Sequence, residues 1–504
     1  MRKSAIGLLL MLAGGAASAQ PAGPAETNTR AALERIAKTD PQLHSVLAVD
    51  PTAIDQARKV DRSGLQGPLA GQPVLIKDNI EAAGPLPTTA GSLALANNVT
   101  NRDAPLVARL RAAGAVIVGK TNLSEWANIR STRSISGWSA VGGQTHNPWA
   151  LDRNPCGSSS GSGAAVAAGL VRFAIGTETD GSVTCPASIN GIVGLKPTVG
   201  LVSRTHIVPI SHSQDTAGPM TASVREAAEL LTVIAGSDPE DPATKDADKH
   251  KTDYAAQLDA NSLKGTRIGV MRFASTPQLD PTFETALAIL REKGAILVDI
   301  KKFDDSAVGK NELPVLLTEL KADMAKYLKG SPAPIGVRTL ADLIAFDKAH
   351  EKQEMSLFAQ ELFDQAEKTK GLDDPAYKKA RQLSFEAAGP NGIDKLLKDN
   401  NVVALVGPTA GPAWKIDAVN GDQFSGGGAG NLAAVAGYPH LTVPMGLIKG
   451  LPVGLSFMGP KWSEARLLSL GYAYEQARGP FPVAKLYPSI EASPEIAPLM
   501  LPQH

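Results

Sequence analysis

The stretch NPCGSSSGSGAAVAAGLVRFAIGTETDGSVTCPAS, residues 154–188, contains the succession of helical, apolar and glycine-rich segments that recurs along the chain. Its small residues lead into a helical segment at Ala164–Val171, which is followed by the apolar run FAIGT at 173–177. A glycine-rich bend then carries Ser182. A helix, a short apolar run and a glycine-rich turn in succession are typical of α/β proteins. The stretch therefore predicts an α/β protein, and it raises the question of what a serine does in such a bend.

The same pattern extends to both sides of this stretch. Short apolar runs alternate with turns rich in glycine, serine and threonine, and they include PVLIK at 73–77, AVIVG at 115–119 and GIVGLKP at 191–197. These runs are too apolar for a sheet with one face in water, so we expect helices on both faces. Apolar runs return at 402–408, 441–446 and 453–459, which indicates one sheet that is completed late in the chain.

The segments between these runs have helical patterns. The spacing of apolar residues predicts helices over about 27–62, 222–236 and 281–293, with a strand at Arg267–Met271. Residues 312–400 are charged and helical, with breaks near 332–334 and 389–392. The sequence has no linker-like stretch and no repeat. We therefore expect residues 20–504 to form a single domain with a helical insert at about 312–400.

The first twenty residues, MRKSAIGLLLMLAGGAASAQ, have the pattern of a secretory signal peptide. Arg2 and Lys3 precede an apolar stretch, and small residues lead to Ala19. The alternative is a membrane anchor, but the apolar stretch is well short of the roughly 20 residues that span a bilayer. We expect residues 1–19 to be removed after Ala19 and the mature protein to be exported, either periplasmic or secreted.

The charge balance limits the possible partners. Lys and Arg together number 50, as do Asp and Glu, so the formal net charge is zero. Bulk electrostatics does not hold such a chain to nucleic acid or to acidic lipid. We expect no nucleic-acid partner and no stable membrane insertion.

The chain has two cysteines, Cys156 and Cys185. Without a nearby pair of histidines they make a poor zinc site. Export would permit a disulfide between them, and the sequence alone leaves their pairing open. The favoured interpretation is two small buried thiols in a glycine-rich core. No metal or organic cofactor is expected.

Two serine and glycine motifs fit this region poorly. GSSSG matches G-x-S-x-G with Ser159 at its centre, but such a nucleophile needs a strand directly before it. Pro148 and Pro155 interrupt any strand there. A phosphate-binding loop would need G-x-x-x-x-G-K-[ST], and no lysine follows Gly163. We therefore favour neither a nucleophile elbow nor a phosphate site.

A serine can also be activated by a neutral amine instead of an imidazole. Lys77 is a candidate, because it ends the apolar run PVLIK and enters a turn. Burial disfavours the ammonium form, and lowering a lysine pKa by about 3 units requires roughly 4 kcal/mol. Asp78 would oppose this shift unless alternation along a strand turns it to the other face. Taken alone, the position of Lys77 favours a solvated lysine.

Three residues together resemble the catalytic set of the amidase signature family: Lys77, Ser158 in CGSSSGSG and Ser182 in ETDGSVTCPAS. The two serines lie 24 residues apart, as that family's motif requires. Other blocks agree along nearly the whole mature chain: PTTAGS at 87–92, VGKTNLSEWA at 118–127, GIVGLKPTVGLVS at 191–203, SQDTAGPM at 213–220, AGYPHLTVPMG at 436–446 and GLPVGLSFMG at 450–459. Within the family, the chain is most similar to bacterial peptide amidases in GTETDGS, in VTCP and in its helical insert.

The resemblance implies both a fold and a catalytic relay. The fold is α/β, with a single large mixed β-sheet covered by helices on both faces in one amidase catalytic domain. Ser182 would be the nucleophile and Lys77 the general base. Ser158 would bridge them, next to an unusual cis peptide bond.

The resemblance also implies an oxyanion hole and supporting residues. Most members have two glycines before the nucleophile, where this chain has Asp180 and Gly181. We expect Asp180 to line the substrate channel, with capping of the turn as the alternative. Thr184 stands where many relatives have arginine, so no role of that arginine is carried over. The resemblance implies that the backbone N–H groups of Thr179, Asp180 and Gly181 stabilise the oxyanion. It also implies that Ser159 and Asp215 form hydrogen bonds that support the site; the alternative is that each belongs to an ordinary turn.

We therefore expect an exported amidase that hydrolyses carboxamides to acid and ammonia by a Ser-Ser-Lys relay with an acyl-enzyme intermediate. The substrate would be a small-molecule or peptide amide, above all the C-terminal amide of a peptide, and the protein would be a monomer. The first alternative is activity on fatty or aryl amides. The others are a transamidation subunit that feeds a tRNA, which the export signal disfavours, and a non-catalytic peptide-binding protein, which would not need Lys77.

Overall fold

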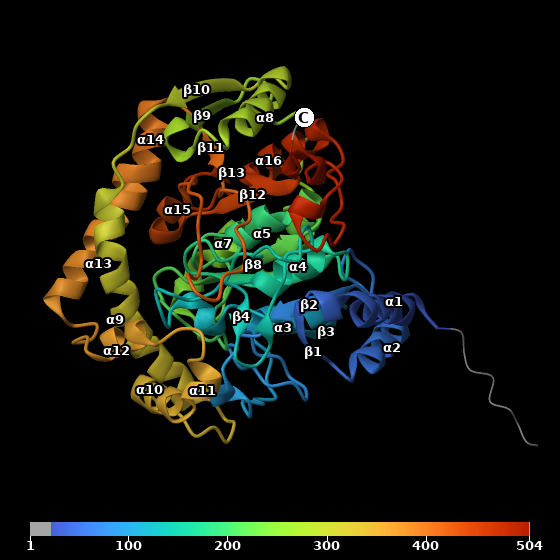
Figure 1. The fold of residues 1–504 in the computed structure, drawn as a ribbon, viewed down its shortest axis with the longest axis vertical. Helices are drawn as coiled ribbons and strands as arrows, with labels where there is room; N and C mark the ends of the chain where they lie inside the picture. Colours follow the sequence, from blue (N-terminus) through green and yellow to red (C-terminus); the bar gives the residue numbers. More distant parts are fainter. Residues whose placement is uncertain (1–21, 503–504) are drawn as a thin grey trace, which may run out of the picture.

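The computed structural model describes residues 22–502, and its centre is one β-sheet of eleven strands (Figure 1). The signal peptide expected at residues 1–19 lies outside the described residues. In their order across the sheet, the strands are β1 (Val46–Val49), β3 (Val116–Thr121), β2 (Pro73–Lys77), β6 (Phe173–Glu178), β8 (Thr216–Thr221), β7 (Val193–Lys196), β12 (His440–Ile448), β13 (Leu451–Met458), β11 (Ala404–Pro408), β9 (Arg267–Met271) and β10 (Ile296–Ile300). A separate pair is formed by β4 (Trp138–Ser139) and β5 (Gly143–Gln144).

The sheet mixes parallel and antiparallel pairs. β2 runs parallel to β3 and β6, and β9 runs parallel to β10 and β11. The other neighbours are antiparallel. β12 and β13 form a hairpin between β7 and β11, so strands from late in the chain join the two parts of the sheet. The prediction of one mixed sheet that is completed late in the chain is confirmed.

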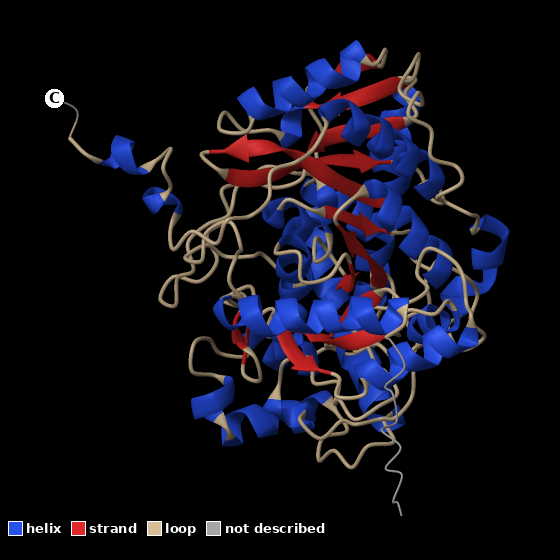
Figure 2. Cartoon of the chain, turned by 90° about the vertical axis from the view of Figure 1, so that its right-hand side faces the viewer, coloured by secondary structure: helices blue, strands red, loops and turns tan. Residues whose placement is uncertain are grey.

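Helices cover both faces of the sheet (Figure 2). One buried core joins a face of the sheet to α3, α6, α8 and α16, and another joins the opposite face to α1, α2, α4 and α5. In β2, Val74 and Ile76 belong to the first core and Leu75 to the second, because successive strand side chains point to opposite faces. The helices are α1 (Pro24–Thr39), α2 (Ala53–Ser63), α3 (Pro105–Ala112), α4 (Ser160–Ala167), α5 (Thr184–Asn190), α6 (Val224–Ile234), α7 (Ala247–His250), α8 (Asp280–Glu292), α9 (Ser306–Gly330), α10 (Leu340–Ala349), α11 (Glu351–Glu354), α12 (Glu361–Glu367), α13 (Pro375–Ala388), α14 (Asp394–Asp399), α15 (Gly430–Ala436) and α16 (Glu464–Arg478).

The helical insert lies close to its predicted bounds. It runs from α9 to α14, between β10 and β11. α9 and α13 lie side by side along one side of the molecule (Figure 1). A further buried cluster joins α9, α10 and α12 to Leu95, Trp126 and Val208. The insert therefore packs against loops that lead into and out of the strands of the sheet.

Most other predicted elements agree with the structure, and one does not. β9 has the predicted bounds, and α6 and α8 lie in the predicted ranges. The helical prediction over 27–62 is wrong in part, because β1 lies between α1 and α2. β1 is a four-residue edge strand that exists through its pairing with β3, far along the chain. A strand so short has too little alternation of its own to be recognised.

Among the residues described, no helix is both long and apolar enough to cross a membrane. α9 has 25 residues, but Glu312, Glu319 and Asp323 lie along it. Figure 2 also shows that the last described residues, which include two short helical turns at Ile490–Ala492 and Ala497–Met500, run away from the sheet.

Cys156 and Cys185 form a disulfide, so the interpretation of two free thiols is wrong. Their sulfur atoms are 2.01 Å apart and their Cα atoms 6.1 Å apart. The bond ties the loop before α4 to α5. Since β6 lies between the two cysteines in the chain, only the folded sheet brings them together. The disulfide lies close in sequence to both serines of the expected relay.

Removing this disulfide should destabilise the protein. In the double variant Cys156→Ala/Cys185→Ala, the unfolded chain regains the freedom of a loop of 29 residues, which corresponds to about 3–4 kcal/mol of unfolding free energy. Urea unfolding followed by circular dichroism measures the difference. A reducing agent should lower the unfolding free energy of the parent protein by a similar amount. It should leave the unfolding free energy of the double variant unchanged. Two free thiols in the denatured, unreduced parent protein would contradict the pairing.

Candidate active site

The expected site residues lie at one edge of the sheet. Lys77 is the last residue of β2, and Thr177 and Glu178 are the last two of β6. β2 and β6 are parallel neighbours, so their carboxyl ends reach the same edge. The loop before α4 brings Ser158 to this edge, and the bend after β6 brings Ser182. Three separate segments of the chain therefore meet here.

Lys77 is fully buried, so the interpretation of a solvated lysine is wrong. Its Nζ donates to Ser158 Oγ at 2.7 Å, to Thr177 Oγ1 at 2.9 Å and to the Thr177 carbonyl at 3.2 Å. Burial lowers the pKa of Lys77 to about 7, although the Asp215 and Glu178 carboxylates act to raise it. Near neutral pH, a large share of Lys77 is therefore the amine that can accept a proton.

Asp78 does not oppose this shift. Its carboxylate accepts the Thr89 N–H at 3.1 Å and lies 3.5 Å from Lys120 Nζ. Asp78 is not among the groups that shift the pKa of Lys77. The expectation that alternation turns Asp78 away from Lys77 fits these contacts.

Ser182 lies beside the loop that carries Ser158. The Ser159 N–H donates to the Ser182 carbonyl at 3.1 Å, which holds the two loops together. Ser182 is 8% exposed. Over residues 22–502, its hydroxyl makes no hydrogen bond, whereas the link between Lys77 and Ser158 is formed. The structure thus brings the three residues of the expected relay to one place and shows the first of its two links.

The backbone around Ser158 has the expected unusual form. The Gly157–Ser158 peptide bond is cis, as the resemblance implies. Ser159 Oγ donates to the Thr177 carbonyl at 3.0 Å and accepts the Thr177 N–H at 3.1 Å. A Cβ at Gly176 would lie 2.7 Å from that Oγ, so the close approach of this loop to β6 requires glycine there. Ser159 therefore ties the Ser158 loop to β6, whose Thr177 also accepts a hydrogen bond from Lys77 of β2.

The bend expected to form the oxyanion hole follows β6 directly. Gly181 has a φ of +74°, which favours glycine. In the part of the chain that is described, the N–H groups of Asp180 and Gly181 donate to no other residue. Thr179 Oγ1 donates to Asp215 Oδ1 at 2.7 Å. The Thr179 side chain thus anchors the bend, and the N–H groups of Asp180 and Gly181 remain available to a substrate oxygen.

Asp215 connects this bend to a neighbouring loop. Its Oδ2 accepts the N–H groups of Ile210 at 2.8 Å and Ser211 at 2.9 Å. Burial raises the pKa of Asp215 to about 6, and the hydrogen bond from Thr179 acts to lower it. Asp215 acts on the site in two ways: it accepts the hydrogen bond from Thr179, and its carboxylate acts to raise the pKa of Lys77. It therefore supports the site and does not form an isolated turn.

Sequence reasoning missed two residues of the site. Glu178 Oε2 accepts the N–H groups of Val183 at 2.9 Å and Thr184 at 3.0 Å, which positions the start of α5. It also accepts the Thr184 hydroxyl at 3.2 Å. Thr177 supplies the hydroxyl that holds Lys77. The only sequence signal for either residue is its place at the end of a strand that leads into the bend.

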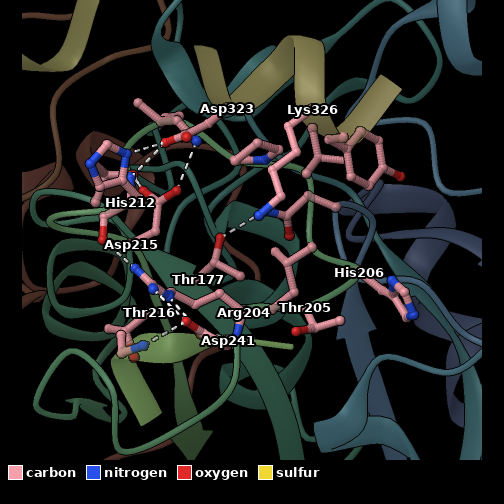
Figure 3. Close-up of a pocket in the computed structure, with 18 of the residues that line it drawn as sticks. Thr177, Arg204, Thr205, His206, His212, Asp215, Thr216, Asp241, Asp323 and Lys326 are labelled. Carbon is pink, nitrogen blue, oxygen red and sulfur yellow. Dashed lines mark hydrogen bonds and ion pairs between the residues drawn. The ribbon is translucent and has the colours of Figure 1, made fainter. Parts of the chain in front are cut away.

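A cavity of about 880 Å³ lies beside these residues (Figure 3). Thr177, Thr179 and Asp215 line it on the side of the sheet, and Arg204 and Lys326 line it elsewhere, the latter from α9. The cavity therefore lies between the strand ends and the helical insert, and it reaches the residue that holds Lys77.

His212 lies at this cavity between two carboxylates. Its Nδ1 is 2.9 Å from Asp323 Oδ2, as Figure 3 shows, and its Nε2 is 3.5 Å from Glu319 Oε1. The three side chains are close enough to bind one metal ion. The hydrogen bond to Asp323 raises the pKa of His212, and Glu319 already accepts from Ser213 and Tyr377. The contacts of His212 with two acids, and those of Glu319 with Ser213 and Tyr377, account for this cluster.

Comparison with known proteins gives consistent matches along the chain. Residues 27–468 match the family model described as Amidase. A probable amidase of Arabidopsis thaliana is 41% identical over 467 residues, which cover 88% of this chain and 85% of that protein. A glutamyl-tRNA(Gln) amidotransferase subunit of Oleidesulfovibrio alaskensis is 36% identical over 492 residues, covering 94% and 97%. The X-ray structure of the native peptide amidase of Stenotrophomonas maltophilia is 53% identical, with a TM-score of 0.86 and coverage of 91% of this chain and 95% of that one.

Proposed function

This chain belongs to the amidase family, and we propose that it is an exported enzyme that hydrolyses the C-terminal carboxamide of peptides. As a family member it is a hydrolase that acts on C–N bonds, and its fold is the amidase signature fold that the resemblance implied. The similarity to a solved peptide amidase over most of both chains supports the peptide amide as substrate.

One contact above all supports the proposal: the buried Lys77 Nζ donates a hydrogen bond of 2.7 Å to Ser158 Oγ. A serine hydroxyl is a weak nucleophile and needs a neighbouring base. An amine with a pKa of about 7 can serve as that base near neutral pH. The contact of the Ser159 N–H with the Ser182 carbonyl keeps the second serine within the same site.

In the proposed acylation step, neutral Lys77 takes the proton of Ser158 while Ser158 takes the proton of Ser182. The Ser182 oxygen bonds to the carboxamide carbon, and the carbonyl oxygen becomes negative. The N–H groups of residues 179–181 stabilise that charge, and losing one such donor typically costs about 2.7–4 kcal/mol. The proton on Lys77 returns through Ser158 to the nitrogen, the C–N bond breaks, and ammonia leaves.

The proposed deacylation step uses the same groups in the same order. A water molecule gives its proton through Ser158 to Lys77 as its oxygen bonds to the acyl carbon. The bond between that carbon and Ser182 Oγ then breaks, and the proton returns to Ser182. The products are a carboxylic acid and the free enzyme, so no cofactor is consumed.

Export is supported by the sequence and by the cysteines. Residues 1–19 have the signal-peptide pattern described above. A disulfide between Cys156 and Cys185 suits an oxidising compartment such as the periplasm or the exterior of the cell. We propose that the mature chain begins after Ala19.

A panel of amides tests the proposed substrate. Mature protein should release ammonia from N-acetyl-L-phenylalaninamide with a kcat/KM at least about tenfold above that for octanamide or L-glutamine, because contacts to the peptide add selectivity. 4-Nitroacetanilide, followed by its released amine, represents aryl amides. A preference for octanamide would indicate an amidase of fatty amides, and a preference for 4-nitroacetanilide would indicate an amidase of aryl amides.

Two other outcomes of this panel correspond to different functions. Turnover of glutamine alone would favour the function named for the amidotransferase of Oleidesulfovibrio alaskensis, which is 36% identical. Tight binding of the peptide amide without any product would indicate a binding protein. Either result would overturn the proposed function.

A further inference from the structure

The proposed relay leaves the side chain of Asp180 without a role. Asp180 lies two residues before Ser182; it is accessible to solvent, although the surrounding protein desolvates its carboxyl. A Cβ placed on Gly181, between them, would meet nothing within 4 Å, so the bend faces open space. The Ser182 hydroxyl lies at the same bend, 8% exposed and without a hydrogen bond to any residue of 22–502. Asp180 therefore borders the place where the substrate carbonyl must lie.

Glu312, from α9, holds the Asp180 carboxyl. The two carboxyl groups are hydrogen-bonded to each other. Gln214 is buried, and its Nε2 donates to Glu312 Oε1 at 2.9 Å and to the Thr179 carbonyl at 3.3 Å. A single amide group thus fixes α9 against the bend next to the nucleophile, and it sets the position of Glu312 relative to Asp180.

The Asp180 end of the acid pair has no N–H donor of its own. Burial, then Glu312 and Glu178, raise the pKa of Asp180 well above its ordinary value, and Lys196 acts to lower it. The hydrogen bond between the two acids acts to raise the pKa of Asp180 and to lower that of Glu312, which makes Asp180 the donor and leaves its other oxygen as an acceptor. Within residues 22–502, no N–H group donates to the Asp180 carboxyl. Because Asp180 is exposed at a bend that borders open space, a donor from the substrate can reach its carboxyl.

We propose that the Asp180 carboxyl, held by Glu312, accepts the N–H group on the carbon next to the scissile carboxamide, and so selects amides of α-amino acids. This inference rests on the proposed function, since it names what the site recognises in a peptide amide. The nitrogen lies about 2.5 Å from the carbonyl carbon, and a single residue separates Asp180 from Ser182, so one substrate can make both contacts. The donor is an amide N–H in a peptide and an ammonium group in a free amino-acid amide.

Two substrates that differ at this nitrogen test the proposal. N-acetyl-L-phenylalaninamide has the N–H group, and 3-phenylpropanamide has the same ring, chain and carboxamide without it. The parent enzyme should prefer the first by about ten- to hundredfold in kcat/KM, and Asp180→Ala should reduce that ratio at least about tenfold. N-methylation of the same nitrogen should cost the parent enzyme a similar factor.

A second variant keeps the acceptor and changes the rest of the side chain as little as possible. Asp180→Asn retains an acceptor oxygen for the substrate N–H and an amide donor for Glu312, so it should keep more of the parent preference than Asp180→Ala does. Glu351→Gln, on α11 of the same insert, changes an exposed carboxylate away from the bend and should leave every ratio unchanged. Circular dichroism of each variant verifies the fold.

The outcomes distinguish the inference from the proposed function. If the parent enzyme turns over neither substrate, the proposed function is wrong. If it turns over both equally, or if Asp180→Ala keeps the parent ratio, the protein is an amidase whose selectivity does not come from Asp180. A ratio that falls strongly in Asp180→Ala, less in Asp180→Asn and not in Glu351→Gln supports the contact.

Discussion

Replacement of Ser182 by alanine is expected to lower the rate of ammonia release from a peptide amide by about 10⁴- to 10⁶-fold. The variant lacks the oxygen that bonds to the carboxamide carbon, and the oxyanion donors and substrate binding supply only the residual part of the rate acceleration. Stability should hardly change, since the Ser182 hydroxyl makes no hydrogen bond to any residue of 22–502. Initial rates with a coupled ammonia assay measure the loss, and thermal unfolding measures stability.

Ser162→Ala provides the matched control for this prediction. Ser162 is also buried, but its hydroxyl contacts Thr121 Oγ1 at 2.7 Å and donates to the Ile175 carbonyl at 3.1 Å, away from the relay. Its loss should affect stability more than rate. Ammonia release by Ser182→Ala at a rate near that of the Ser162→Ala variant would remove Ser182 from the mechanism.

Replacement of Lys77 by methionine is expected to lower kcat/KM by about 10²- to 10⁴-fold and to remove its dependence on pH near neutrality. In the parent enzyme, kcat/KM should rise with pH through about 7, the pKa of Lys77. Below that pH the amine holds a proton and cannot take one from Ser158. Above it the amine is neutral and the relay is open. Methionine has a similar shape and no proton to exchange, so the rise should disappear.

Lys196→Met identifies which lysine causes the rise. Lys196 is also fully buried, and burial lowers its pKa to about 8. Its Nζ donates one hydrogen bond, to the Pro197 carbonyl at 3.2 Å, and touches neither serine. The rise through about pH 7 should persist in Lys196→Met. If it persisted in Lys77→Met instead, another group would be the base.

The fold was largely predictable because many of its strands contain a continuous apolar run. Val74, Leu75 and Ile76 fill cores on both faces of the sheet, and a run of this kind stands out from the turns around it. The insert was recognisable because it is charged and helical between two groups of such runs. β1 was missed, since a short edge strand takes its structure from β3 and carries little pattern of its own.

The site was predictable in part. Lys77, Ser158 and Ser182 stood out through a family motif, and the structure brings all three to one edge of the sheet. Thr177 and Glu178 escaped notice, because a threonine and a glutamate at a strand end are common and their partners lie in other segments. Glu312 could not be foreseen, since its contact with Asp180 arises only when α9 packs against the bend.

The sequence by itself determined the α/β class, the helical insert and the three residues that we propose for the relay. It did so because apolar runs, helical spacing and motifs are properties of short stretches. Only the tertiary structure decided that Lys77 is dry, that Cys156 and Cys185 are bonded and that Asp180 meets Glu312. The pKa of an amine depends on how much water the whole fold removes from it. The exclusion of water from Lys77 depends on residues that are distant in the chain, such as Thr177, which lies 100 residues away.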